Sequence, residues 1–367
     1  MKRIPLTEAK AGMVLMEKVV TRTGQVIADA QSVLTKQSIA HLEFYGIDTI
    51  CVEPAAEPPS PKAAPQTFTK GNVQNPTYSQ KIVKSKAFQT FQLNYTLTIQ
   101  SIHESFEGFV NRQEPLPMDM LLEKTNALFY SCKTTIELFD MLHNMRSIND
   151  TIYAHCLNVA LICRMLSKWL KLDNAKRDTL TLCGLLHDIG KLKIPENVLN
   201  KPGKYTDEEF ALVKKHPQFG YELLKDLPLD DHIKLAALMH HERCDGSGYP
   251  DHLSSDDIDD CAMIVAIADV YDAMTAARPH RAPLCPFQAI SNFEKDGLSQ
   301  YKPKYILTFL EYIASTYQNN RVLLNNGQSA NIVMINKNQL SAPIVQLDDQ
   351  SCINLQDHPD LFIKSIL

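Results

Sequence analysis

The sequence lacks the features that would assign it to a membrane, a secreted or a polymer-binding class. No run of 18 apolar residues occurs, so no membrane span is expected. Residues 1–5 have no signal-peptide apolar segment, and the nine cysteines form no CxxC pair, which favours a reduced, cytoplasmic protein over a disulfide framework. Basic residues are not in excess: 37 Lys+Arg against 42 Asp+Glu give a net charge of −5, which excludes global attraction to nucleic-acid polymers.

The length and the composition predict a multidomain globular chain. With 367 residues, of which 44% are hydrophobic, two or three domains are expected. Five prolines within residues 54–65 exclude helix and central strand there and mark a linker. We divide the chain into an N-terminal module, a Pro-rich linker, a helical hairpin, a histidine-rich helical segment and a C-terminal extension: residues 1–53, 54–77, 78–145, 146–300 and 301–367.

The N-terminal module and the hairpin are predicted from local patterns. Strands are expected within residues 13–20, 25–27 and 48–52, with a helix from Thr35 to Gly46. Apolar residues from Phe88 to Phe109 recur every three or four positions in a heptad-like seam, and a helix from Met118 to Leu142 completes the hairpin. The seam is either a dimer surface or a cover for the helical core that follows.

The remaining elements make the predicted fold mainly α. Helices are expected over residues 152–172, before His187, from Thr206 to near His216, from Asp230 or Asp231 to His240, over 256–277, and from Lys304 to Tyr317. Strands are expected over residues 321–324, 330–335 and 343–347. The prediction is an all-helical bundle core with a small α+β module before it and a small β appendage after it.

The chemistry is concentrated in four residues of the helical segment. The pair His187-Asp188 stands at a helix end, Asp269 interrupts an apolar run, and His155 lies within an apolar helix. Each residue alone also fits a capping pair, a buried ion pair or a core histidine. Together they supply two imidazoles and two carboxylates, a mixture suited to Mn²⁺, Fe²⁺ or Zn²⁺.

Three further histidines extend this set. Adjacent residues on a helix diverge by about 100°, so His240 and His241 can share a metal centre only near a helix end. The glycines and proline of residues 245–250 provide such a turn. With His216 the count reaches seven ligands, which suits two ions bridged by a shared carboxylate.

These motifs resemble the HD-GYP branch of the HD-domain phosphohydrolases. The resemblance covers roughly residues 148–281 and is carried by five motifs in order: His187-Asp188-Ile189-Gly190-Lys191, His216-Pro217, His240-His241-Glu242-Arg243, Asp245-Gly246-Ser247-Gly248-Tyr249-Pro250, and Asp269 to Arg278-Pro279. Residues 1–52 are similar to a short module found ahead of HD-GYP domains. The resemblance makes residues 146–300 the catalytic domain.

The resemblance implies a bacterial phosphodiesterase that hydrolyses cyclic di-GMP with a metal-bridging hydroxide. By position, His155, His187 and Asp269 would hold one ion, His216, His240 and His241 the other, and Asp188 would bridge them. Trinuclear members have a glutamate where this chain has Thr151, so two ions, iron or manganese, and linear pGpG as the main product are expected. Lys191 would assist the leaving group, and the substrate-binding residues would be Arg278, Arg281 and Tyr249.

Two other functions compete with this interpretation. The first is hydrolysis of another cyclic dinucleotide, such as 3′,3′-cyclic GMP-AMP, because base choice cannot be read from the motifs. The second is a non-catalytic sensor whose N-terminal module or hairpin contacts a partner such as a diguanylate cyclase. A homodimer is a further expectation, through the seam described above.

Overall fold

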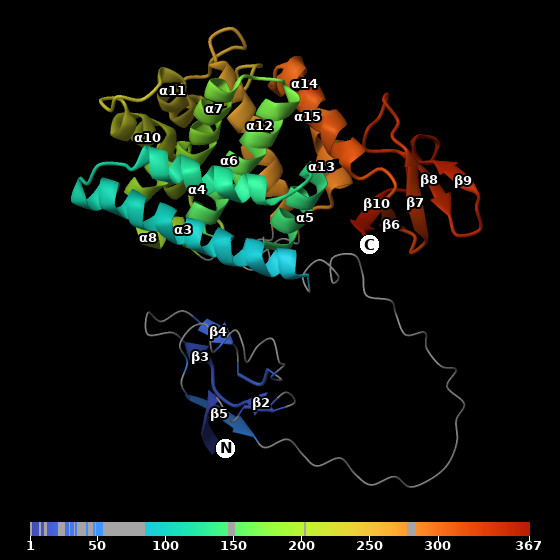
Figure 1. The fold of residues 1–367 in the computed structure, drawn as a ribbon, viewed down its shortest axis with the longest axis horizontal. Coiled ribbons are helices and arrows are strands. Elements are labelled where there is room, and N and C mark those ends of the chain that lie inside the picture. The colour runs from blue at the N-terminus through green and yellow to red at the C-terminus, as the bar shows by residue number, and fades with distance from the viewer. Residues whose placement is uncertain are drawn as a thin grey trace. The chain divides into compact units, whose positions relative to one another are not determined.

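The chain divides into two compact units, Met1–Val73 and Gln74–Leu367, in a computed structural model (Figure 1). The structure describes residues 85–145, 151–201, 203–276 and 283–367 of the second unit. In the first unit it describes residues 2–6, 9–10, 13–20, 26–28, 30–32, 34, 42, 47 and 49–53. The predicted linker at 54–77 and the predicted substrate residues Arg278 and Arg281 lie outside the described residues.

The N-terminal unit contains two small antiparallel sheets. One has the strand order β1 (Lys2–Pro5), β5 (Thr49–Glu53), β2 (Val14–Leu15), and the other pairs β3 (Val19–Val20) with β4 (Val26–Ala28). The buried side chains of Ile4, Leu15 and Ile50 are part of its core. The predicted strands are confirmed at 25–27 and 48–52, and the predicted run 13–20 forms two strands, β2 and β3, that belong to different sheets. Strand β1 is an addition whose four residues are too few to show a pattern. The helix predicted from Thr35 to Gly46 falls outside the described residues except at Leu42.

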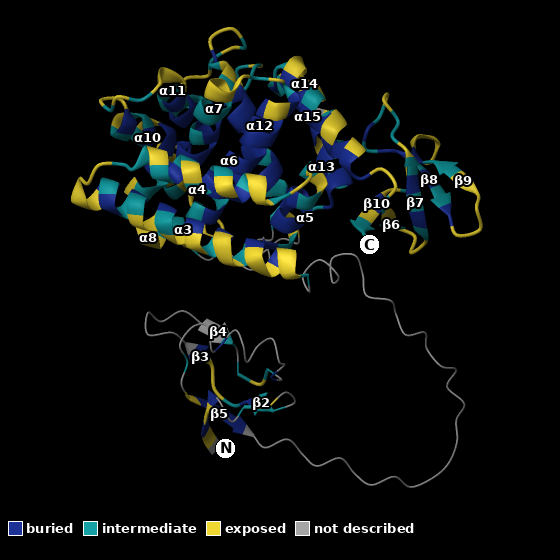
Figure 2. Cartoon of the chain, viewed as in Figure 1, coloured by how far each residue is buried: buried dark blue, intermediate teal, exposed yellow. Residues whose placement is uncertain are grey.

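The larger unit is built around helices that are buried on nearly all sides. These are α6 (Ile152–Trp169) and α12 (Asp260–Thr275), which contact each other and are buried over most of their length (Figure 2). Helix α7 (Asn174–Leu186) packs against both and is buried mainly from Leu180 onward. A helix that is apolar all round can be stable in water only when other elements enclose it. The surrounding helices supply that enclosure.

Helices α3 (Lys86–Arg112) and α4 (Met118–Ser131) lie against α6. The apolar seam of α3 is buried, and within it the Tyr95 hydroxyl donates a hydrogen bond to Asn158 Oδ1 of α6 at 2.7 Å. The seam therefore covers the core of its own unit, as one of the two interpretations expects, and its buried side chains do not form an exposed dimer surface.

The predicted helix from Met118 to Leu142 is wrong as one element, because it is broken at Cys132–Thr134. Helix α5 (Thr135–Met145) begins after the break. Thr134 Oγ1 accepts the Glu137 backbone N–H at 3.1 Å, and the Glu137 carboxylate accepts the Lys133 N–H at 2.6 Å. These two contacts satisfy N–H groups that have no partner within a helix, so they favour a new start at Thr135.

A second correction concerns the helix predicted from Thr206 to near His216. The capping box of Thr206 and Glu209 is present, but α9 (Asp207–Val213) ends early and His216 begins α10 (His216–Leu224). Proline is favoured in the first turn of a helix, and Pro217 occupies that place. The neighbouring elements are η2 (Ile189–Lys193), α8 (Glu196–Leu199) and α11 (Asp231–Met239), which Asp230 caps as predicted.

The C-terminal part adds short helices and one antiparallel sheet. The helical elements are α13 (Pro286–Asn292), η3 (Phe293–Gly297), α14 (Leu298–Gln300) and α15 (Pro303–Thr316). The strands lie in the sheet in the order β10 (Ile363–Ile366), β6 (Arg321–Leu324), β7 (Ser329–Met334), β8 (Ile344–Leu347), β9 (Cys352–Asn354). A single helical turn, η4 (Leu355–Asp357), follows β9 along the chain. The mainly α fold class is confirmed, and no described helix is long and apolar enough to cross a membrane.

Candidate metal centre

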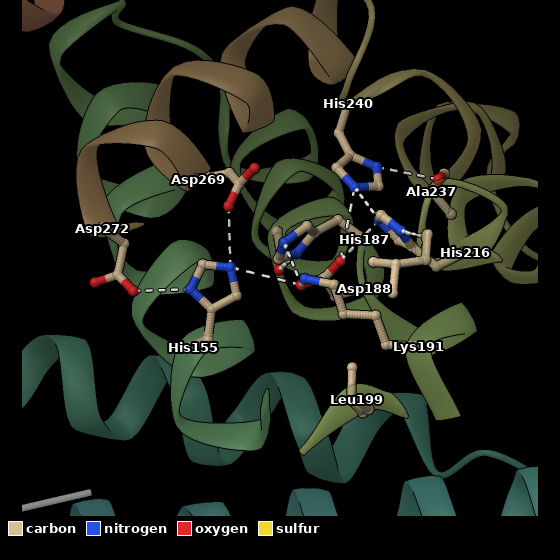
Figure 3. Close-up of polar contacts among 12 residues, drawn as sticks. His155, His187, Asp188, Lys191, Leu199, His216, Ala237, His240, Asp269 and Asp272 are labelled. Atoms are coloured by element: carbon tan, nitrogen blue, oxygen red, sulfur yellow. Dashed lines mark hydrogen bonds and ion pairs between the residues drawn. The ribbon is translucent and has the colours of Figure 1, made fainter. Parts of the chain in front are cut away.

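The seven predicted ligands come from helices α6, α10 and α12 and from the turns that follow α7 and α11, and they meet in two groups. One group is His155, His187 and Asp269; the other is Asp188, His216, His240 and His241. In each group the ligating atoms lie within 4.8 Å of one another. Figure 3 shows imidazoles and carboxylates from separate helices pointing toward a common point around Asp188. The structure therefore brings together every residue of the predicted ligand set.

Asp188 lies between the two groups and faces each with a different oxygen. Its Oδ2 is 3.5 Å from His155 Nε2 and 3.4 Å from His187 Nε2. Its Oδ1 is 3.2 Å from His216 Nε2 and 3.7 Å from His240 Nε2. A carboxylate placed in this way can contribute one oxygen to each of two neighbouring sites.

Backbone carbonyls orient three of the histidine rings. In each, Nδ1 lies within 3.0 Å of a carbonyl oxygen three or four residues earlier: His187 on Gly184, His216 on Val213, and His240 on Ala236 and Ala237. Because Nδ1–H donates there, a neutral ring carries its lone pair on Nε2. All three Nε2 atoms therefore present lone pairs toward Asp188.

The converging lone pairs leave buried polar atoms without partners. His187 Nε2 and Asp188 Oδ1 are buried and have no hydrogen-bond partner of good geometry among the described residues. His216 Nε2 and His240 Nε2 lie 3.1 Å apart, so two acceptors face each other. Buried acceptors are normally paired, and a cation would satisfy all of them together. The donor set of imidazole nitrogens and carboxylate oxygens fits first-row divalent metals.

A second carboxylate orients His155 and was missed in the sequence. Asp272 Oδ2 lies 2.8 Å from His155 Nδ1, while His155 Nε2 faces Asp269 Oδ1 at 3.0 Å (Figure 3). Metal-binding histidines commonly donate their other N–H to a carboxylate, which fixes the ring and raises its basicity. Asp272 stands three residues after Asp269, so the helical spacing placed it on the same face.

The charges of the centre are shifted by burial and by one another. Burial lowers the pKa of His155, but hydrogen bonds with Asp269 and Asp272 outweigh it and raise that pKa to about 10. Burial lowers the pKa of His240 to about 4. Burial raises the pKa of Asp188, yet Lys191 and His187 hold it well below its usual value. The Asp188 carboxylate is therefore ionised and His240 neutral, as metal ligands must be, whereas His155 would have to release a proton when an ion binds.

Lys191 enters the centre from η2, three residues after Asp188. Its Nζ contacts Asp188 Oδ2 (Figure 3). Burial lowers the pKa of its ammonium group, but the charge of Asp188 more than compensates and the pKa is raised overall. Lys191 consequently stays charged at neutral pH.

The glycine turn after His241 has a second residue that sequence reasoning missed. Glu242 is buried, and its carboxylate accepts the Asp251 N–H at 2.6 Å and the Leu253 N–H at 3.1 Å. A Cβ on Gly248 would lie 2.4 Å from Glu242 Cα, so the turn requires glycine there. Nothing in the sequence distinguishes Glu242 from an exposed acidic residue, because the turn also contains Asp245.

The turn places Tyr249 beside the centre. Its ring stacks on the His241 imidazole, with centroids 4.6 Å apart and planes 20° apart, and Lys214 Nζ lies 5.3 Å from the tyrosine ring centroid. Tyr249 is therefore linked directly to a predicted ligand. Thr151, in contrast, caps α6 by accepting the Ala154 N–H at 3.2 Å.

The sequence relatives are phosphodiesterases of cyclic dinucleotides. A cyclic di-GMP phosphodiesterase of Pseudomonas aeruginosa is 40% identical over 38% of this chain and 34% of its own length. The 3′3′-cGAMP-specific phosphodiesterase 2 of Vibrio cholerae is 33% identical over 53% of this chain and 38% of its own length. A cyclic di-GMP phosphodiesterase of Thermotoga maritima is 32% identical over 52% of this chain and 53% of its own length.

These matches span about a third to a half of the length of the relatives. The family model described as HD domain matches residues 119–305, which contain every predicted ligand. That range is more than half of the 367 residues. The chain belongs to the HD domain family, as the motif order predicted.

Proposed function

We propose that this chain is a metal-dependent phosphodiesterase that hydrolyses a cyclic dinucleotide, with cyclic di-GMP as the first candidate. The observation that carries the proposal is the convergence of Nε2 lone pairs on Asp188, which leaves buried acceptors for cations. The names of the relatives in Pseudomonas aeruginosa and Thermotoga maritima support the substrate. The relative in Vibrio cholerae supports 3′,3′-cyclic GMP-AMP as the second candidate.

The chain would hold two divalent ions, iron or manganese. His155, His187 and Asp269 would bind one, His216, His240 and His241 the other, and Asp188 would face both. The hydroxyl of Thr151 is engaged in the cap of α6, which supports two ions rather than three. When bound, such ions activate water as a nucleophile and polarise the phosphodiester.

Residues of this chain would bind the substrate and complete the reaction. Lys191 keeps its ammonium group at the centre and would place positive charge or a proton at the leaving ribose oxygen. Tyr249, stacked on His241, would contact a base or the phosphate backbone. Arg278 and Arg281 would bind phosphate oxygens, since guanidinium groups match them in bidentate geometry. Linear pGpG would be the main product.

Asp188→Ala should reduce hydrolysis of cyclic di-GMP to background, because it removes the oxygen that each group faces. The measurement is product chromatography with cyclic di-GMP and cyclic GMP-AMP, using anaerobic protein loaded with iron or manganese. Asp348→Asn, on the surface of the C-terminal sheet, is the control and should keep full activity. Unchanged turnover by Asp188→Ala contradicts the proposal, and tight binding without any turnover in the unmodified chain favours a sensor.

The same preparations test the number of ions. Elemental analysis should find about two iron or manganese ions per chain. A count of three contradicts the inference from Thr151. Dimer formation, contact with a diguanylate cyclase and a cytoplasmic location stay predictions.

A further inference from the structure

A third cluster of metal-ligating side chains lies away from Asp188, where helices α11 and α12 begin. A histidine nitrogen of His232, a carboxylate oxygen of Asp259 and the sulfur of Cys261 lie within 4.8 Å of one another. We propose that these three residues bind a zinc ion. The site is independent of the proposed hydrolysis and differs from the metal centre in having a sulfur ligand.

Asp259 is fixed in orientation by the start of α12. Its Oδ1 accepts the backbone N–H of Cys261 at 2.8 Å and of Ala262 at 3.2 Å. Its Oδ2 is directed to His232 Nδ1 at 2.6 Å, and only 8% of the side chain is exposed. The carboxylate therefore offers Oδ2 to the cluster without the loss of its capping contacts.

His232 is held from the backbone and is open to solvent. It lies in the first turn of α11, where its N–H donates to Asp230 Oδ1 at 2.9 Å. Its side chain is 52% exposed. Water can reach the imidazole, so a solvent molecule can complete a four-coordinate site with three protein ligands.

Cys261 supplies the sulfur of the cluster from the first turn of α12. The Cys261 side chain is partly buried, and its sulfur lies within 4.8 Å of the ligating atoms of His232 and Asp259. Cys261 is also the second residue of α12, and a helix N-terminus favours a thiolate. Geometry and surroundings both present Cys261 as a ligand.

The donor set selects zinc among the common divalent ions. A thiolate with an imidazole suits Zn²⁺, whereas Mg²⁺ and Ca²⁺ prefer oxygen ligands and thiolates are soft ligands that hard ions do not favour. The ligands around Asp188 are nitrogen and oxygen atoms only. One chain would thus hold two metal environments of different chemistry.

The proposed zinc site would tie together two helices that also position ligands of the metal centre, His240 at the end of α11 and Asp269 within α12. His240 follows His232 by eight residues and Asp269 follows Cys261 by eight residues. At about 1.5 Å per helical residue, each pair is separated by about 12 Å along its helix. Zinc at the starts of α11 and α12 would stabilise their packing without contact with the substrate.

Cobalt spectroscopy of the full chain tests the site, because a thiolate bound to Co²⁺ gives a near-ultraviolet charge-transfer band that imidazole and carboxylate ligands do not. Co²⁺ is added until the centre around Asp188 is also filled, because nitrogen and oxygen ligands bind Co²⁺ more tightly than Mn²⁺. The band should then appear, and Zn²⁺ should remove it. Cys261→Ser should abolish the band. His232→Ala should weaken Co²⁺ binding at least about tenfold, since even outer partners of metal ligands contribute about 10–100-fold.

The matched control is Cys352→Ser, which removes an exposed cysteine on β9 and should keep the band. Circular dichroism verifies that each variant is folded, and the exposed His232→Ala keeps the test decisive if Cys261→Ser does not fold. A full chain without the band, or a band that persists in Cys261→Ser, overturns the proposal. Hydrolysis of cyclic di-GMP is a separate readout, so failure of either proposal is recognised independently.

Discussion

Asp272 is the residue whose role is least visible in the sequence and most direct in the structure. It does not reach the converging Nε2 atoms, but it holds Nδ1 of His155 at 2.8 Å and so fixes which nitrogen faces Asp188 and Asp269. It is a positioning residue. Its carboxylate also favours the basic, strongly donating form of the imidazole.

Asp272→Asn should weaken manganese binding by about 10–100-fold, because the amide can retain the contact but not the charge. The readout is a manganese titration of chelator-treated protein, followed by hydrolysis at saturating manganese, which should be largely restored. Asp348→Asn serves again as the surface control. Affinity equal to that of the unmodified chain would show that Asp272 does not act through His155.

The sequence revealed those site residues whose polar side chains interrupt an otherwise apolar, buried helix. His155 and Asp269 stand out because each interrupts an apolar helix, and the motif order related them to His187 and Asp188. Asp272 and Glu242 do not stand out in this way, since a second carboxylate near a helix end is common. Their partners, His155 and the turn at Asp251 to Leu253, are distant or irregular in the chain.

Among the helices, capping residues predicted where a helix begins more accurately than the apolar pattern predicted where it ends. Thr206 with Glu209 and Asp230 marked α9 and α11 correctly. The break between α4 and α5 was missed because the apolar pattern continues through it. Strands β9 and β10 were missed because three or four residues show little alternation, and β10 pairs with β6, about forty residues earlier in the chain.

Thr134→Ala should lower the free energy of unfolding by about 1 kcal/mol, since it removes the hydroxyl that accepts the Glu137 N–H. Chemical denaturation measures the change. Thr90→Ala is the matched control, because Thr90 is an exposed residue within α3 and alanine favours helix. If both variants are equally stable, the break is not maintained by this cap.

For the whole molecule, the net charge of −5 does not oppose binding of an anionic ligand. Two divalent ions would add about four positive charges at one place, so the metals and not the overall field would attract phosphates. The acidic chain and an anionic substrate are therefore compatible.

Addition of Mn²⁺ to chelator-treated protein should raise the melting temperature of the larger unit. Ions that bind only the folded chain stabilise it, by about 4 kcal/mol at 1,000 times the dissociation constant. Differential scanning calorimetry measures the shift, and Asp188→Ala should lose most of it. An equal shift in Asp188→Ala would assign the stabilisation to manganese bound elsewhere.

The position of Asp188 between both groups has a consequence for how this chain would respond to scarce metal. Because one carboxylate serves both sites, occupation of the first fixes and polarises a ligand of the second, so loading is expected to be cooperative. Half-loaded molecules would then be rare, and the population would divide into empty and filled chains. Activity would follow metal supply as a threshold, with a Hill coefficient above one.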